Sequence, residues 1–308
     1  DGPLGGDNRI PAATQDAPPG REKLSQVFER EISIERMPVL ASHVLGGRAV
    51  LPVALHIECL AHAAMHGSPG LSFQGLNDLR VLHGFLLPAG ESRRIRGFAG
   101  KPQKLDGAFQ VPVELRGTRS DGRDVSHSSA KVFVGATYHA ESPRLAVAHL
   151  KPYPQSIAAT YRTTLFHGDD LHALVRIEGV SDEGIVADVR TAPEPAQWLV
   201  EPFRHTWLAD PLVLDGAFQM MILWSMSQRG EPNLPTGFAR YRQFQRTIPA
   251  GEIRVVAKIV KETGHLIHAD IEFVDRSGSV VARFDDAEFV GDSALSSRFR
   301  QNRQEIPV

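Results

Sequence analysis

Two short stretches of this sequence carry side chains that can exchange protons with a substrate. His43 is followed closely by Gly47 and Pro52, and Asp215 is followed four residues later by Gln219. An imidazole is a base near neutral pH, and a carboxyl group whose pKa is raised by burial is an acid. Proton abstraction next to a carbonyl group requires a base and an acid of this kind. The sequence therefore predicts general acid–base chemistry if the fold brings the two stretches together.

The residues after His43 predict a place for the carbonyl oxygen of a substrate. His43 ends a stretch expected to be extended, residues 37–44, and a Gly46-Gly47 turn follows it. Pro52 then stands where a proline is best tolerated, in the first turn of a helix. Backbone N–H groups and the positive end of a helix dipole can hold a developing oxyanion. The alternative is a structural histidine bonded to backbone groups, the usual state of one histidine among thirteen.

Asp215 lies in a segment, residues 212–224, that is apolar almost all the way round, as is typical of a helix buried on most faces. Burial is expected to raise the pKa of this carboxyl group and favour its protonated form. Gln219, at i+4, lies on the same face and can orient the carboxyl group. Alternatively, Asp215 binds free N–H groups at the helix start, but Asp210, directly before Pro211, is the better N-cap.

The same order of predicted elements surrounds each stretch. Strands come first, then a helix that starts with a proline, and then further strands. The helices are predicted from Pro52 to about residue 67 and from Pro211 to about residue 228. Strands are predicted at residues 27–34, 79–87, 91–100, 108–116 and 125–136, and again at residues 174–177, 185–191, 241–248, 253–261, 266–274 and 280–290. The fold class is therefore α+β, with an antiparallel sheet wrapped around one central helix in each half.

This order divides the chain into five parts. The first, residues 1–22, is rich in Gly and Pro without periodicity and is expected to be a linker. The others are an N-terminal half (residues 23–140), a proline-containing connector (141–160), a C-terminal half (161–291) and a tail (292–308).

Composition excludes several classes of protein. Hydrophobic residues make up 42% and charged residues 23% of the chain, as in globular proteins, and the net charge of -2 argues against broad nucleic-acid binding. No apolar run approaches the roughly 18 residues of a membrane span. A single cysteine, Cys59, excludes an intramolecular disulfide and fits a reducing, cytoplasmic compartment. His62 and His66 have metal-ligand spacing, but no carboxylate or cysteine cluster completes a convincing metal site, so these histidines are expected to be surface or core residues.

The two motifs resemble the paired signatures of a known family. His43-x-x-x-Gly47-x-x-x-x-Pro52 and Asp215-x-x-x-Gln219 are similar to those of dehydratase domains from polyketide and polyunsaturated fatty acid synthases. The resemblance covers roughly residues 22–291 and implies a double hotdog fold.

The sequence also departs from the family pattern in two places. Many relatives carry a Gly-Tyr-x-Tyr-Gly-Pro-x-Phe segment between the motifs. The corresponding run here, residues 164–171, keeps Gly168 but lacks both tyrosines and the proline. Asp210-Pro211 replaces a His-Pro pair before the second motif. The departures concern substrate positioning and leave both reacting groups in place.

The resemblance implies dehydration of a β-hydroxyacyl thioester to an α,β-enoyl thioester. His43 would remove the α-proton, and Asp215, oriented by Gln219, would protonate the leaving hydroxyl. Gly47, with the start of the Pro52 helix, would polarise the thioester carbonyl, and Gly168 is expected to contact the substrate. The alternatives are a double-bond isomerase or cyclisation template on the same fold, and a degenerate domain that only binds carrier proteins.

The resemblance also implies partners. The substrate would arrive on the phosphopantetheine arm of an acyl carrier protein, and neighbouring domains of a megasynthase would flank the chain, with a homodimer left open. Neither a metal nor another cofactor is expected, nor a nucleic acid or membrane partner. Carrier proteins are usually acidic, so a basic patch is expected near the site, and six arginines are candidates for it: Arg93, Arg94, Arg96, Arg240, Arg242 and Arg246.

Overall fold

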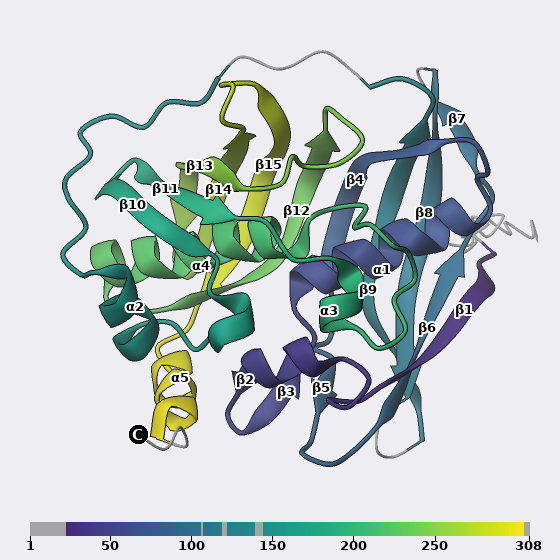
Figure 1. Cartoon of the computed structure of the whole chain (residues 1–308), viewed down its shortest axis with the longest axis horizontal. Helices are drawn as coiled ribbons and strands as arrows, with labels where there is room; N and C mark the ends of the chain where they lie inside the picture. Colours follow the sequence, from purple (N-terminus) through teal and green to yellow (C-terminus); the bar gives the residue numbers. More distant parts are fainter. Residues whose placement is uncertain (1–22, 106, 119–121, 139–143, 305–308) are drawn as a thin grey trace, which may run out of the picture.

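A computed structural model describes residues 23–105, 107–118, 122–138 and 144–304 of the chain (Figure 1). The linker expected at residues 1–22 lies outside the described residues, as do residues 139–143 of the expected connector and residues 305–308 of the expected tail. In the described part of the chain, no helix is long and apolar enough to cross a membrane.

The first half is built around the helix α1 (Val53–His66), whose buried residues include Ile57, Leu60 and Ala64. Their spacing gives the helix an apolar face broad enough to be covered by a curved sheet. The strands of this half are β1 (Ser25–Ile32), β4 (Ser72–Val81), β6 (Arg93–Ala99), β7 (Gln103–Leu105), β8 (Ala108–Thr118) and β9 (Asp124–Gly135). A small separate sheet contains β2 (Val44–Leu45), β3 (Arg48–Val50) and β5 (Leu86–Leu87).

The second half repeats this plan around α4 (Pro211–Arg229), in which every residue from Pro211 to Ser225 is buried. Helix burial on all faces is what its apolar sequence predicted. The strands of this half are β10 (Leu174–Ser181), β11 (Gly184–Arg190), β12 (Asn233–Gln243), β13 (Glu252–Thr263), β14 (Leu266–Val274) and β15 (Val280–Gly291). Short helices α2 (Ile157–Thr163), η2 (Asp169–Leu171) and α3 (Pro195–Trp198) precede α4.

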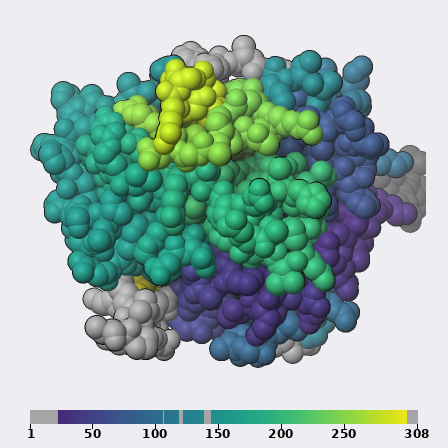
Figure 2. All heavy atoms as spheres, in the orientation of Figure 1, coloured from purple at the N-terminus to yellow at the C-terminus, as the bar shows by residue number. Residues whose placement is uncertain are grey.

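The two halves share one continuous sheet, because β4 pairs antiparallel with β12 and the strand order runs β1-β6-β8-β9-β4-β12-β15-β14-β13-β11-β10. Gly75 lies at this junction with φ +142°, and a Cβ atom there would collide with the backbone oxygen of Tyr241. Glycine is therefore required where the strands approach. On the face shown in Figure 2, the purple surface of the N-terminal half borders the green surface of the C-terminal half. The prediction of a double hotdog fold, α+β with one helix wrapped by sheet in each half, is confirmed.

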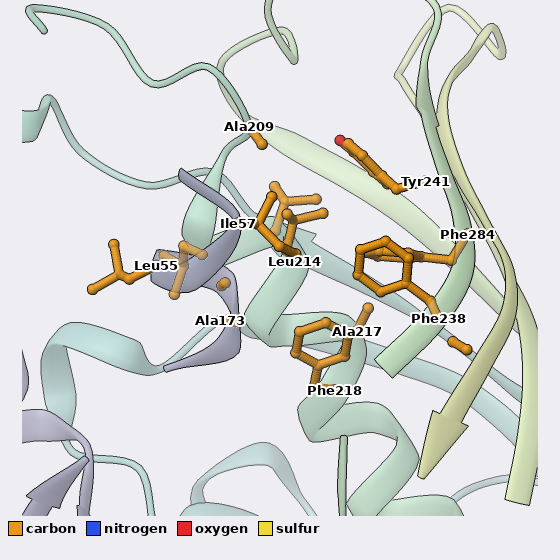
Figure 3. Packing of buried hydrophobic residues seen from close by; sticks show 14 of the residues in the cluster. Leu55, Ile57, Ala173, Ala209, Leu214, Ala217, Phe218, Phe238, Tyr241 and Phe284 are labelled. Atoms are coloured by element: carbon orange, nitrogen blue, oxygen red, sulfur yellow. The ribbon is translucent and has the colours of Figure 1, made fainter. Parts of the chain in front are cut away.

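Aromatic side chains fill the space between α4 and the sheet of its own half (Figure 3). Phe218 of α4 lies 5.8 Å from Phe284, measured between ring centroids, and Phe238 lies 4.8 Å from Phe284. Close-packed rings of this kind hold the helix rigidly. Asp215, three residues before Phe218, therefore sits on a fixed element.

A buried carboxylate links α1 to the segment that leads into α4. Both oxygens of Glu58 accept hydrogen bonds from the backbone N–H of Leu208, at 3.1 and 3.0 Å, and one also accepts from Ala209 at 3.0 Å. Burial nevertheless raises the pKa of Glu58 to about 7, because the desolvation outweighs these bonds. The link fixes the start of the second central helix against the middle of the first.

Several predicted elements differ from the observed ones. Residues 37–44 were expected to be extended, but residues Pro38–Ser42 form a 3-10 helix, η1, which begins with a proline pre-set for helical φ. Strand β4 begins at Ser72, earlier than the predicted residue 79. Helix α2 lies across the end of the expected connector, where Ser156 caps it by accepting from the N–H of Ala159. Helix α5 (Leu295–Gln304) lies in the expected tail.

Candidate active site

His43 follows η1 directly and is 9% exposed. Its Nδ1 atom lies 2.7 Å from the carbonyl oxygen of Val50, on β3. A carbonyl oxygen only accepts, so Nδ1 carries the proton of the neutral ring and Nε2 keeps a lone pair. Burial lowers the pKa of His43 to about 4, against the opposing effect of the bond to Val50. The histidine is therefore a neutral base with a fixed tautomer.

Asp215 lies in the second turn of α4 and is 3% exposed. Asp210 is the N-cap of the helix, as predicted, and accepts from the N–H groups of Leu212 and Val213. Asp215 is therefore not needed for capping. Burial raises its pKa to about 7, although the hydrogen bond from Gln219 acts in the opposite direction. Near pH 7 and below, the group carries a proton that it can donate.

Gln219 holds the carboxyl group of Asp215 in one orientation. Its Nε2 atom donates to Asp215 Oδ2 at 2.7 Å and to the carbonyl oxygen of Leu171 at 2.8 Å. Its Oε1 atom accepts from the hydroxyl of Tyr161 at 2.7 Å, and that hydroxyl in turn accepts from the N–H of Leu174 at 2.9 Å. A fully bonded network of this kind fixes each member. The tyrosine from α2 is part of the support that sequence reasoning missed.

His167 is the main site residue that sequence reasoning missed. Its backbone forms a β-bridge with that of His43, and their ring centroids are 5.3 Å apart. Its Nε2 atom lies 3.4 Å from Oδ2 of Asp215. One ring nitrogen of each histidine and one oxygen of Asp215 all lie within 4.8 Å of one another. The fold thus brings together the two predicted groups, one from each half, and adds a third.

The same three side chains are of the types that ligate a divalent metal ion. Two neutral imidazoles and one carboxylate would supply the donor atoms. The other histidine pair considered from the sequence is different, because His62 stacks on Phe203 with the ring centroids 4.2 Å apart. This contact gives His62 a packing role.

Gly47, Pro52 and Gly168 are placed around this centre. Gly47 occupies the turn between β2 and β3 with φ +71°. Pro52 is the N-cap of α1 and precedes the helix, whereas the sequence had suggested its first turn; no side chain caps this helix end. The N–H of Gly168 donates to the carbonyl oxygen of Ser42 at 2.8 Å, and a Cβ atom on Gly168 would lie 3.0 Å from the Cα atom of Ser42. Gly168 thus allows the segment of His167 to approach that of His43.

Aromatic rings close one side of the centre. Phe166 lies 5.0 Å from His43 and 4.1 Å from His167, measured between ring centroids. Phe299 of α5 lies 4.6 Å from Phe166 and is 2% exposed, and α5 packs beside β2. The tail helix therefore covers Phe166 and shields the reacting groups from water.

Most of the six arginines expected to form a basic patch are engaged by neighbours. Acidic partners are Glu91 for Arg93, Glu29 for Arg94, Asp124 for Arg96 and Asp285 for Arg240. Arg242 lies over the ring of Phe133, 4.2 Å from its centroid. Arg246 lines a cleft together with Arg204. Arg246 is exposed, and the paired side chains of Arg94 and Arg240 are also 72% and 54% exposed.

Family models and a curated relative match most of the chain. Residues 17–116 match the model described as polyketide synthase dehydratase domain, and residues 142–291 match the one described as polyketide synthase dehydratase N-terminal domain. One subunit of the polyunsaturated fatty acid synthase of Thraustochytrium sp. is 28% identical over 270 residues. The match spans 83% of this chain but only 9% of the synthase polypeptide.

Solved structures share the fold at low sequence identity. The dehydratase domain from the CurF module of the curacin polyketide synthase is 15% identical with a TM-score of 0.67, over 89% of this chain and 95% of that one. GphF dehydratase 1 is 20% identical with a TM-score of 0.67, over 85% and 92% of the two chains. A trans-acyltransferase polyketide synthase enoyl-isomerase is 15% identical with a TM-score of 0.60, over 85% and 99%. At these identities the likeness concerns the fold alone.

Proposed function

Because the chain belongs to the polyketide synthase dehydratase domains, we propose that it removes water from a β-hydroxyacyl thioester carried on an acyl carrier protein. One observation carries the proposal above all. A neutral histidine with a free Nε2 lone pair and a carboxyl group with a raised pKa lie within 4.8 Å of each other in a buried centre. That pairing supplies a base for the α-carbon of the substrate and an acid for the hydroxyl group on the neighbouring β-carbon.

In the proposed reaction, Nε2 of His43 takes the proton from the α-carbon of the substrate. The electrons of that C–H bond form the α,β double bond, and the bond from the β-carbon to the hydroxyl oxygen breaks. Asp215 gives its proton to the departing oxygen, and water leaves. His43 then carries the extra proton and Asp215 the negative charge, so a net transfer of one proton through solvent restores both groups. Gln219 keeps the carboxyl group oriented throughout.

We assign the thioester carbonyl to the region between Gly47 and the start of α1. The absence of a side-chain cap at Pro52 supports this assignment, because the positive end of the helix is not neutralised by a carboxylate there. Stabilising an oxyanion contributes about 10²–10³-fold to the rate when one donor is involved. The carrier arm would deliver the substrate, and the proton transfers themselves require no metal or redox cofactor. Neighbouring synthase domains are the proposed partners.

The direct test is incubation with a synthetic β-hydroxyacyl pantetheine thioester, read by mass spectrometry. Loss of the mass of one water is the expected result. An unchanged mass with a shifted double bond in an enoyl thioester would instead favour an isomerase, which the same two groups can also serve. Carrier-protein binding without any change of either thioester would favour a domain that only docks carriers.

The pH dependence of the reaction is expected to be bell-shaped. His43 acts only when neutral, so activity falls as the pH drops below its pKa of about 4. Asp215 acts only when protonated, so activity falls as the pH rises above its pKa of about 7. A profile of kcat/KM against pH measures both limbs on the free enzyme. An activity that still increases from pH 7 to pH 9 would contradict Asp215 as the acid.

Replacing Phe299 by alanine is expected to change the preference for acyl groups. The change removes a buried ring from behind Phe166 and widens the space beside the reacting groups. The ratio of kcat/KM for a long acyl thioester to that for a short one should rise several-fold, with some loss of stability. Arg298→Ala, on the exposed side of the same helix, is the matched control and should leave the ratio unchanged. If the ratio were unchanged in Phe299→Ala, α5 would not border the space that holds the acyl chain.

A further inference from the structure

The short helix η2 is bonded to the residue that orients the acid. It spans only Asp169–Leu171, and a single turn of 3-10 helix does not hold its own position. The carbonyl oxygen of Leu171 accepts from Nε2 of Gln219 at 2.8 Å, and the same nitrogen donates to Oδ2 of Asp215 at 2.7 Å. The place of η2 therefore affects the place of the carboxyl group.

The other side of η2 is bonded to Ser42, which directly precedes the base His43. The hydroxyl oxygen of Ser42 accepts from the backbone N–H of Asp170 at 3.2 Å. Its O–H group donates in return to Oδ2 of Asp170 at 3.1 Å. The carbonyl oxygen of Ser42 also accepts from the N–H of Gly168 at 2.8 Å. Ser42 is 8% exposed, so little water competes for these bonds.

The bonds to Ser42 supply a cap that η2 lacks in its own sequence. The first N–H groups of a helix need acceptors outside the helix, and serine is among the residues preferred for this role. Gly168, the N-cap residue of η2, has no side chain. Ser42 therefore caps this turn from the other half of the chain. The cap joins the segment that carries the base to the segment that supports the acid.

We infer that Asp170, through its bonds to Ser42, is a positioning residue for His43. The pair sets the distance of the imidazole from the acid, Asp215, and neither partner exchanges a proton in this role. When the pair is broken, Ser42 and η2 can shift against each other, and the imidazole leaves the geometry for proton abstraction. A displacement of about 1 Å at a reaction centre can cost about 10²-fold in rate. The inference rests on the proposed dehydration.

Substitutions in η2 test the positioning role by kinetics. Asp170→Ala removes the acceptor of the Ser42 hydroxyl and should lower kcat about tenfold, with KM within about twofold of the wild-type value. Asp170→Asn keeps an oxygen that accepts and should restore kcat to within about threefold. Asp169→Ala is the matched control, because that side chain is fully exposed, and it should turn over at the wild-type rate. A wild-type kcat in Asp170→Ala, or a change in KM alone, would overturn the proposal.

A double-mutant cycle tests whether the two residues act through each other. Ser42→Ala removes the hydroxyl but leaves the carbonyl bond to Gly168. If the pair acts as one unit, the combined Ser42→Ala and Asp170→Ala variant loses no more in kcat than the slower single variant. Losses that multiply would show that the two side chains act independently, against the proposal. Rates are expressed per folded molecule, with the folded fraction taken from thermal melting.

Nuclear magnetic resonance tests the same placement without turnover. In a chain with isotope-labelled histidine, the ring signals of His43 are assigned by their absence in His43→Ala. They should shift in Asp170→Ala and in Ser42→Ala, and stay in place in Asp169→Ala. Unchanged His43 signals in Asp170→Ala would contradict the positioning role. A wild-type chain that releases no water from the synthetic thioester would instead contradict the proposed function, whatever these signals show.

Discussion

Replacing Asp215 by asparagine is expected to abolish water loss without disturbing the fold. The amide has the shape of the carboxyl group, and its oxygen can still accept from Gln219, but it has no acidic proton to give. Removing a general acid typically costs about 10²–10⁴-fold in rate. Single-turnover conversion of the synthetic thioester, followed by mass spectrometry, measures the loss.

A half-buried carboxylate outside the centre, in the same half, provides the control for this substitution. Asp188 on β11 pairs with Arg176, which is largely exposed. Asp188→Asn should therefore turn over at the wild-type rate. Full turnover by Asp215→Asn would reject the assignment of the acid.

The same Asp215→Asn substitution should make the chain relatively more stable as the pH rises. The pKa of Asp215 is about 7 in the folded chain, against an ordinary value of 3.8. Between these values the unfolded chain binds fewer protons than the folded one, so the free energy of unfolding falls as the pH increases. For a fully buried group this loss is up to about 4 kcal/mol. The difference in Tm, variant minus wild type, should grow from pH 4 to pH 7 and then level off.

Replacing His43 by alanine is expected to abolish water loss as well, because no other group at the centre is set up as the base. Its Nδ1–H bond to Val50 leaves Nε2 as the free base, whereas Nε2 of His167 faces Asp215. The loss should again be about 10²–10⁴-fold. The variant should be less stable by about 1–3 kcal/mol, since the carbonyl oxygen of Val50 loses a partner.

A second buried histidine provides the control for this loss of stability. His127 is 6% exposed, and its Nδ1 atom contacts the carbonyl oxygen of His83 at 3.0 Å, so its local bonding resembles that of His43. His127→Ala should lose stability by a comparable amount but keep its activity per folded molecule. Thermal melting and turnover are measured on both variants. If His43→Ala and His127→Ala turned over at comparable rates per folded molecule, His43 would contribute to stability and would not be the base.

Local pattern was enough to predict the elements that carry the site. The apolar periods and prolines located both central helices, and Asp210 was identified as the cap of the second. The pair Asp215 and Gln219 followed from helix geometry, because residues four apart share a face. The extended conformation predicted around Pro38 was wrong, since a proline in the first turn also begins a short helix. Contacts with residues outside this segment decide between the extended and the helical conformation.

The sequence by itself determined which groups can exchange protons and which helix face carries the acid. Only the tertiary structure decided that His43 and Asp215, 172 positions apart, lie in one buried centre, and that His167 joins them. The reason is physical. Periodicity reports which face of an element is apolar, but not which distant element covers it. The pKa values of about 4 and about 7 arise from desolvation, which depends on atoms that the rest of the chain packs around each group.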